Sequence, residues 1–92
     1  MARLESDEID ERLAKLDGWS RQGEALVREH KSENFLGSVE FVNRVAPVAE
    51  DMNHHPDLAI SWDTVTVTIT THSEGGLTEA DFTLAERIDA LS

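Results

Sequence analysis

The stretch TVTVTITT, residues 64–71, decides the fold, because β-branched residues recur in it with a period of two. Such alternation is typical of a β-strand that buries one of its faces. The apolar face is predicted to hold Val65, Val67 and Ile69, and the threonines are expected on the opposite face. The preceding residues 58–62 alternate in the same way, and Asp63-Thr64 would join the two strands as a hairpin.

Helical periodicity flanks this hairpin on both sides. After the hairpin, Thr78 and Asp81 fit a capping box at the start of a last helix. The buried face of that helix is predicted to hold Ala80, Leu84, Ile88 and Leu91. Before the hairpin, a helix is expected to start near Ser38. Its apolar stripe would consist of Phe41, Val45, Ala49 and Met52. Pro47 lies within this stripe and removes a backbone hydrogen bond, so we expect a kink or a late helix start.

The first third of the chain predicts a helix followed by another hairpin. Ser6 would cap this first helix and Gly18 would end it. The hairpin would run from Trp19 to about Phe35 and turn near Gln22-Gly23. The element order is therefore α-β-β-α-β-β-α. That order predicts a single α+β domain over residues 1–92, with a four-stranded antiparallel sheet and the helices packed on one face.

The composition narrows the class of protein. The chain has 92 residues, no cysteine and a formal net charge of -11, which disfavours nucleic acid and anionic membranes as partners. Its only lysines are Lys15 and Lys31, which suits either a high-salt environment or ordinary acidic solubility. With no long apolar run and no signal-peptide core, the protein is expected to be cytoplasmic. A small core without disulfides predicts a homo-oligomer, either a dimer or a tetramer.

Three of the four histidines gather around the second hairpin. His54 and His55 precede it and His72 follows it, so the fold should return them to one edge of the sheet. Asp81 could face the same edge, although its capping role accounts for it equally well. Imidazoles titrate near neutral pH, so this cluster suits proton transfer. The adjacent pair could instead fill a turn, and His30 is interpreted as a surface residue.

The spacing of these residues resembles a known signature. Glu50, the run His54-His55-Pro56, Trp62, His72 and Asp81 are similar in type and spacing to the pterin-4a-carbinolamine dehydratases. Gly18-Trp19 resembles the N-terminal Gly-Trp of that family. The likeness covers nearly the whole chain and is strongest over residues 41–91. Two departures lie outside the signature: His30 and Ser32 replace aromatic residues, and Pro47 is unusual within its helix.

The resemblance implies a hydro-lyase that dehydrates 4a-hydroxytetrahydropterin to quinonoid dihydropterin. This reaction recycles a tetrahydrobiopterin-type cofactor after aromatic amino-acid hydroxylation, and it requires no metal and no redox cofactor. His54 and His72 would form the acid-base pair, and His55 would hold the substrate. The implied substrate-binding residues are Glu50, which would orient a histidine, Asp81, at the polar end of the site, and Trp19, as a wall of the pterin site.

Two alternatives compete with this interpretation. The family also includes members that stabilise the dimer of a transcription factor, so a non-catalytic binding or dimerisation role is the main one. Activity on a 4a-hydroxypterin would separate the two roles. The second alternative is a zinc site, because three histidines with Asp81 or Glu50 would satisfy zinc in number and type. Adjacent histidines in an extended segment point in opposite directions, which disfavours it.

Overall fold

The alternating stretch forms the central strand β4 (Thr64–Ile69), and its three apolar side chains are fully buried, as predicted. It pairs antiparallel with β3 (Asp57–Ser61), with Ser61 opposite Thr64. The turn is therefore Trp62-Asp63, and the predicted turn at Asp63-Thr64 was wrong by one residue. Trp62 takes a positive φ of 53° at this tight turn. Lys31 Nζ donates to the Asp63 carboxylate at 2.9 Å, which helps to hold the turn in place.

The structure is a computed structural model that describes residues 2–91, and it confirms the predicted fold class and element order. The remaining elements are α1 (Ser6–Leu13), β1 (Ser20–Gln22), β2 (Ala25–Lys31), α2 (Phe35–Met52), the 3₁₀ turn η1 (His72–Glu74) and α3 (Glu79–Asp89). The four strands form one antiparallel sheet in the order β1-β2-β4-β3.

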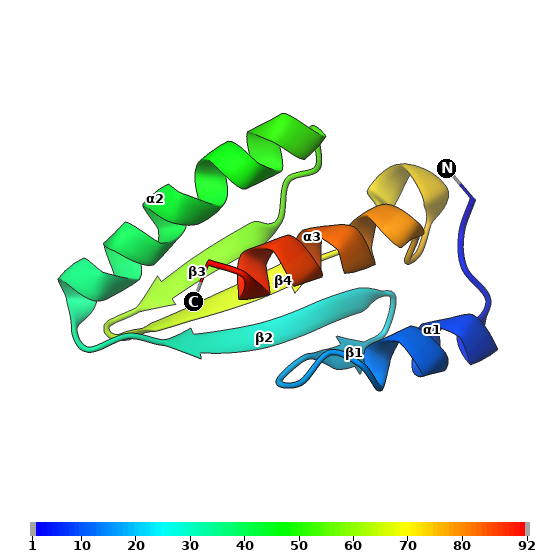
Figure 1. Ribbon diagram of the computed structural model, residues 1–92, viewed down its shortest axis with the longest axis horizontal. Coiled ribbons are helices and arrows are strands. Elements are labelled where there is room, and N and C mark those ends of the chain that lie inside the picture. The colour runs from blue at the N-terminus through cyan, green and yellow to red at the C-terminus, as the bar shows by residue number, and fades with distance from the viewer. Residues whose placement is uncertain (1, 92) are drawn as a thin grey trace.

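The hydrophobic core lies between the sheet and the helices. In Figure 1, α2 and α3 lie across the sheet, and α1 lies beside β1. The core joins Ile9 of α1, Phe41 of α2 and Leu84 of α3 to the apolar face of β4. Thr66 and Thr68, on the opposite face of the sheet, stay half-buried. The helices therefore cover one face of the sheet. The C-terminal end of β4 lies between α3 and the end of α2 (Figure 1).

Helix α2 begins earlier than predicted. Its N-cap is Asn34, whose side-chain oxygen accepts a hydrogen bond from the Gly37 backbone N–H at 2.8 Å. The predicted start near Ser38 missed this cap, although asparagine is a favoured N-cap residue. The helix continues without interruption across the exposed Pro47, so the expected late start was wrong.

The N-terminal elements differ from the prediction in detail. Ser6 is the first residue of α1, and Glu5 occupies the N-cap position without a side-chain bond. The helix ends at Leu13 with Ala14 as its C-cap, so the prediction that Gly18 would end it was wrong. Gly18 instead takes a φ of +86° in the turn that leads to β1. The hairpin turns at Gly23-Glu24, one residue later than predicted, and its second strand ends at Lys31 rather than near Phe35.

His30 is not a free surface residue, and this prediction was wrong. It lies on β2 opposite Val65, so its side chain faces the helices. Its ring stacks on Phe41 of α2, with ring centroids 3.7 Å apart. Burial lowers the pKa of His30 below its usual 6.5, and the nearby Arg28 and Arg44 lower it further.

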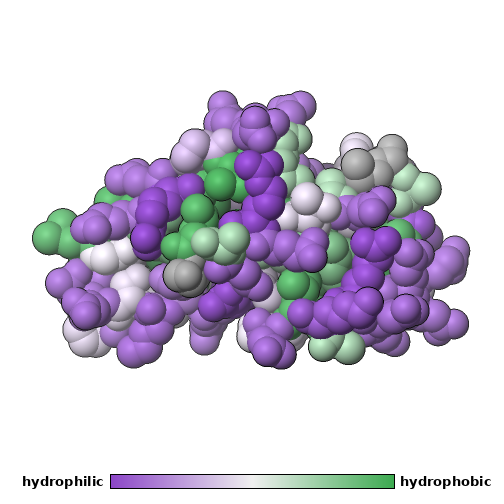
Figure 2. All heavy atoms as spheres, in the orientation of Figure 1, coloured by the Kyte–Doolittle hydropathy of each residue, from purple (hydrophilic) through white to green (hydrophobic). Residues whose placement is uncertain are grey.

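One end of the molecule exposes large apolar side chains. Phe35 and Leu36 open α2 with 53% and 70% of their surface exposed, and Trp62 is 70% exposed. Ser38 Oγ donates to the Trp62 backbone carbonyl at 2.9 Å, which ties the β3–β4 turn to the start of α2. Figure 2 shows hydrophobic atoms at this end of an otherwise largely hydrophilic face. No helix within residues 2–91 is both long and apolar enough to cross a membrane.

Candidate functional site

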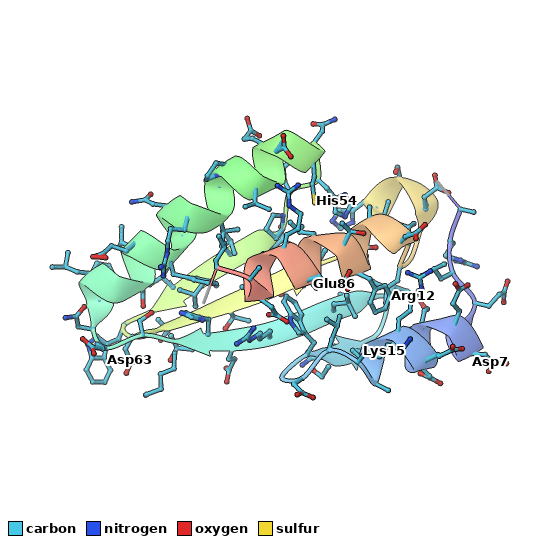
Figure 3. All side chains as sticks on the ribbon, in the orientation of Figure 1. Asp7, Arg12, Lys15, His54, Asp63 and Glu86 are labelled. Carbon is cyan, nitrogen blue, oxygen red and sulfur yellow. The ribbon has the colours of Figure 1, made fainter. Side chains whose placement is uncertain are left out.

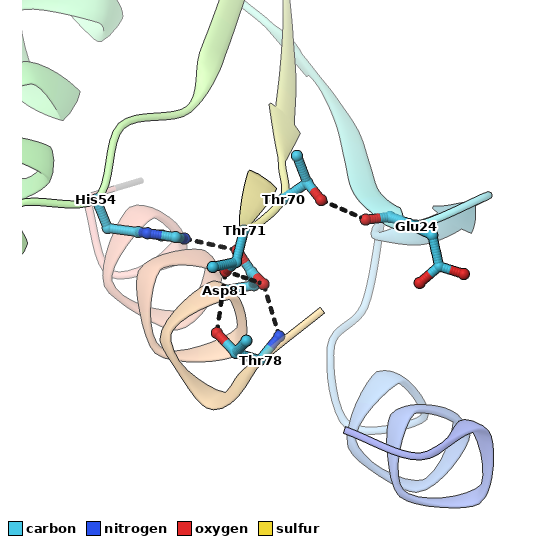
Figure 4. A network of polar contacts seen from close by, with 6 residues as sticks. All are labelled: Glu24, His54, Thr70, Thr71, Thr78 and Asp81. Carbon is cyan, nitrogen blue, oxygen red and sulfur yellow. Dashed lines mark hydrogen bonds and ion pairs between the residues drawn. The ribbon is translucent and has the colours of Figure 1, made fainter. Parts of the chain in front are cut away.

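Asp81 is a fully buried carboxylate in the first turn of α3. Its Oδ2 atom accepts hydrogen bonds from the Thr78 backbone N–H at 2.7 Å and from Thr71 Oγ1 at 2.8 Å. The first bond belongs to the predicted capping box. Its Oδ1 atom contacts His54 Nε2 at 2.6 Å (Figure 4). A buried carboxylate requires such partners, and Asp81 has them on both oxygens.

The end of α2 directs His54 toward this carboxylate. Asn53 ends the helix in the left-handed conformation, with a φ of 49°, and the His54 backbone N–H still donates to the Ala49 carbonyl at 3.0 Å. The chain then leaves the helix axis, and the His54 side chain lies between the end of α2 and the corner formed by η1 and α3 (Figure 3). Only 15% of that side chain is exposed. His54 is therefore held by backbone geometry at one end and by Asp81 at the other.

His55 and Glu50 form a second pair on the solvent side. His55 Nε2 contacts the Glu50 carboxylate, and their side chains are 55% and 74% exposed. Glu50 lies in the last turn of α2, so a short loop joins the two partners. The structure thus separates the adjacent histidines, with His54 directed inward and His55 outward.

His72 lies at the start of η1, directly after Thr71. Within residues 2–91 its ring takes part in no hydrogen bond or ion pair. It lines a shallow pocket of about 330 Å³ together with Glu24, Ala25, Thr70, Gly75 and Gly76. Because Thr71 contacts Asp81 and precedes His72, the backbone of His72 lies close to the His54–Asp81 pair. Neither His54 nor Asp81 is among the residues that line the pocket of His72. Of the three clustered histidines, His72 is the one whose ring nitrogens have no partner within residues 2–91.

A larger hollow of about 580 Å³ lies elsewhere, between α1 and α3. It is lined mostly by charged side chains, including Glu8, Arg12 and Glu86, and it contains no histidine. Its size alone does not make it the site, because none of the residues that suit proton transfer near neutral pH line it.

The structure does not bring Trp19 together with the other predicted site residues. Trp19 is buried in the core, and its indole N–H donates to Asp89 Oδ1 at 3.0 Å. Asp89 also pairs with Arg28. Asp89 ends α3, about 12 Å along the helix from Asp81. Trp19 therefore fastens the sheet to the far end of α3, and we leave it out of the candidate site.

Thr71 and Glu24 are site residues that the sequence interpretation missed. The hydroxyl of Thr71 contacts both Asp81 and Thr78, at 2.8 Å and 3.0 Å. Its position beside His72 was a usable signal, but the alternating pattern explained it as a strand residue. Glu24 follows a turn glycine and reaches the pocket only through the tertiary fold.

The arrangement favours one tautomer of His54. An ionised Asp81 can only accept hydrogen bonds, so the Nε2 atom of His54 carries the hydrogen and Nδ1 keeps a lone pair. A histidine oriented in this way is suited to accept or return a proton at a fixed position. Within residues 2–91, no three histidine or carboxylate side chains gather closely enough to share a metal ion.

Comparison with known families agrees with this arrangement. A family model described as pterin 4 alpha carbinolamine dehydratase matches residues 2–91. The chain belongs to this family. It is similar to relatives named for the same activity in Sulfolobus acidocaldarius, at 44% identity over 97% of this chain and 98% of the relative, and in Thermomicrobium roseum, at 46% identity over 100% and 99%. The predicted family resemblance is confirmed.

Solved structures of pterin dehydratase type share the fold. A transcriptional coactivator/pterin dehydratase from Brucella melitensis is 37% identical, covers 97% of both chains and superposes with a TM-score of 0.92. A pterin dehydratase-like protein described as a RuBisCO assembly factor of the alpha-carboxysome is 25% identical, covers 80% of this chain and 88% of its own, and has a TM-score of 0.69. Proteins of this fold are thus named for more than one role.

Proposed function

We propose that this chain is a hydro-lyase that dehydrates 4a-hydroxytetrahydropterin to quinonoid dihydropterin and water. The observation that carries the proposal is the pairing of His54 with the buried Asp81, beside a second histidine, His72, whose ring is unpartnered within residues 2–91. The family membership supplies the substrate class. The two histidines therefore differ in their surroundings. Asp81 orients His54, and the ring of His72 is available to a ligand.

The reaction needs two proton transfers and no change of oxidation state. One histidine donates a proton to the 4a-hydroxyl, so that the C4a–O bond breaks and water leaves. The other accepts the N5 proton, whose bonding electrons form the N5–C4a double bond. Acid-base residues at neutral pH are sufficient for this chemistry. Asp81 would keep His54 in one orientation and one tautomer through the cycle.

His55 and Glu50 would bind rather than react. Their side chains form a pair that is exposed to solvent. A ligand can therefore reach them. Uniform binding of this kind lowers the Michaelis constant without changing turnover. In the cell, aromatic amino-acid hydroxylation would supply the 4a-hydroxytetrahydropterin, and reduction of the quinonoid product would regenerate the tetrahydropterin.

The test is the rate of dehydration of freshly generated 4a-hydroxytetrahydropterin, followed by stopped-flow absorbance. The expected result is a rate that rises linearly with protein concentration above the spontaneous rate in the same buffer. Heat-denatured protein is the control for buffer and surface effects. A rate equal to the spontaneous one, from protein that circular dichroism shows to be folded, would contradict the proposal.

The zinc alternative has its own test. Elemental analysis of protein purified without an affinity tag is expected to find well below one transition metal per chain. Stoichiometric zinc that a chelator removes together with the activity would favour the metal site.

A binding role is the second candidate, and the exposed Phe35, Leu36 and Trp62 favour it. Large apolar side chains that gather on a surface often mark a contact with another protein. The two structural neighbours are named as a coactivator and as an assembly factor. Folded protein without dehydratase activity would make this role the better account.

A further inference from the structure

The pocket beside His72 has a second wall from a distant part of the chain. Glu24 and Ala25, at the β1–β2 turn, line it together with His72 and the loop Gly75-Gly76. Its volume of about 330 Å³ suits a small ligand. A ligand that contacts His72 in this pocket can therefore also contact Glu24.

The backbone of Glu24 is fixed. Its carbonyl oxygen accepts a hydrogen bond from Thr70 Oγ1 at 2.5 Å, as Figure 4 shows. Antiparallel pairing of Gln22 with Ala25 closes the turn on the other side. The Cα atom of Glu24 is therefore held by these hydrogen bonds rather than by a flexible loop.

The carboxylate of Glu24, in contrast, has a hydrogen-bond partner on only one of its two oxygens within residues 2–91. Its Oε1 atom lies 3.4 Å from Arg21 Nη2, a long and exposed contact, and 54% of the side chain is exposed. No hydrogen bond within residues 2–91 engages Oε2. This oxygen retains its capacity to accept a ligand donor.

Gly76 makes room for this carboxylate. The Oε2 atom of Glu24 lies 2.7 Å from the point where a Cβ atom on residue 76 would stand, and the Arg3 side chain occupies the same space. Arg3 also donates to the Gly75 carbonyl at 3.3 Å. Any larger residue at position 76 would displace one of these two side chains, so the pocket wall depends on glycine here.

We propose that the Glu24 carboxylate recognises the 2-amino-4-oxopyrimidine edge of the substrate, an inference that rests on the proposed dehydratase function. That edge presents two adjacent donors, N3–H and the 2-amino group. A carboxylate accepts from two parallel donors at once, which gives both strength and orientation. Glu24 would thus determine which ring system binds in the pocket that His72 lines.

The experiment compares Glu24→Gln and Glu24→Ala with wild type in steady-state kinetics. Both variants are expected to raise KM by about tenfold or more while kcat changes less than about threefold, because the lost contact is a binding contact. Glu29→Gln is the matched control, since Glu29 is an exposed carboxylate on the uncovered face of β2. It should leave both constants unchanged.

A binding measurement gives a readout that does not depend on turnover. Calorimetry would compare a stable dihydropterin with the analogue that lacks the 2-amino group. Wild type is expected to prefer the amino compound by about tenfold, and Glu24→Ala should abolish this preference. A preference retained in Glu24→Ala, with KM unchanged, would overturn the role of Glu24 while leaving the dehydratase function intact. Wild-type protein that neither binds the pterin nor accelerates its dehydration would overturn both.

Discussion

His54 Nε2 lies 2.6 Å from Asp81 Oδ1, across 27 residues of sequence. The contact joins the loop after α2 to the first turn of α3, next to the end of β4. One carboxylate therefore caps a helix with one oxygen and orients a histidine with the other. Its two functions can be separated, because different partners engage the two oxygens.

Asp81→Asn is expected to lower both turnover and stability. An amide has only one acceptor oxygen, and when that oxygen keeps the bonds to Thr78 and Thr71 its NH2 group faces His54. His54 then loses the acceptor that orients it, which should cost at least about tenfold in kcat. The buried hydrogen bonds it weakens should cost about 1–3 kcal/mol of unfolding free energy, measured by urea denaturation. Thr71→Val is the matched control, since it removes one bond to Oδ2 and leaves Oδ1 with His54. An equal loss of turnover in both variants would show that the His54 contact has no special role.

His30→Phe is expected to change how stability depends on pH. The pKa of His30 is lowered in the folded protein, so below about pH 6.5 the unfolded chain takes up the proton first. The stacking of neutral His30 on Phe41 thus contributes its full share of the unfolding free energy above pH 6.5. This share is progressively lost as the pH falls below that value. The Asp63 carboxyl does not interfere, because the hydrogen bond from Lys31 lowers its pKa from 3.8 and places its effect at more acid pH.

Unfolding midpoints of wild type and His30→Phe, measured from pH 7.5 to 5.0, check this. The unfolding midpoint of His30→Phe should rise relative to that of wild type as the pH decreases. A constant difference across that range would mean that His30 does not titrate in this way. His30 is also unsuitable as a neutral control in kinetic work, because it packs against α2.

Pro47→Ala is expected to stabilise the protein. Pro47 lies inside an unbroken α2 and is exposed, so alanine would restore one backbone hydrogen bond without disturbing the core. The gain should be about 2 kcal/mol, after allowing for the greater freedom of the unfolded chain. Thermal unfolding measures it. A lower midpoint would indicate that the proline shapes the helix end that carries His54.

The protein is expected to form a dimer or tetramer, because its core is small and lacks disulfides. Light scattering coupled to size exclusion at micromolar concentration should give a mass at least twice the 10.2 kDa of one chain. A single species at the chain mass, unchanged up to about 100 µM, would refute this.

The sequence predicted the helices and strands well where periodicity and residue type indicated the same element. Residues 64–71 combine a period of two with β-branched side chains, and their burial follows that parity. The start of α2 was missed because Gly37 is a poor helix former and Phe35 and Leu36 add nothing to the buried stripe. Only the cap chemistry of Asn34 marked the true boundary.

The sequence predicted only part of the candidate site: it missed Thr71 and Glu24, and it included Trp19, which lies in the core. Hairpin topology predicts that His54 and His72 lie near one edge of the sheet. The partner of each ring depends on tertiary packing, which the local sequence does not determine. Trp19 illustrates the limit: a resemblance in sequence suggested a site wall, and the fold places its indole against Asp89 in the core. The stacking of His30 on Phe41 is likewise invisible without the crossing of β2 and α2.

The most direct test of the account is turnover of His54→Ala and His72→Ala on 4a-hydroxytetrahydropterin, with folding checked by circular dichroism. Each variant is predicted to lose roughly 10²- to 10⁴-fold in kcat, the usual contribution of one positioned acid or base. His55→Ala should instead raise KM more than it lowers kcat. If His54→Ala and His72→Ala both keep more than about half of wild-type turnover, the histidines are not the proton-transfer groups and the account is wrong.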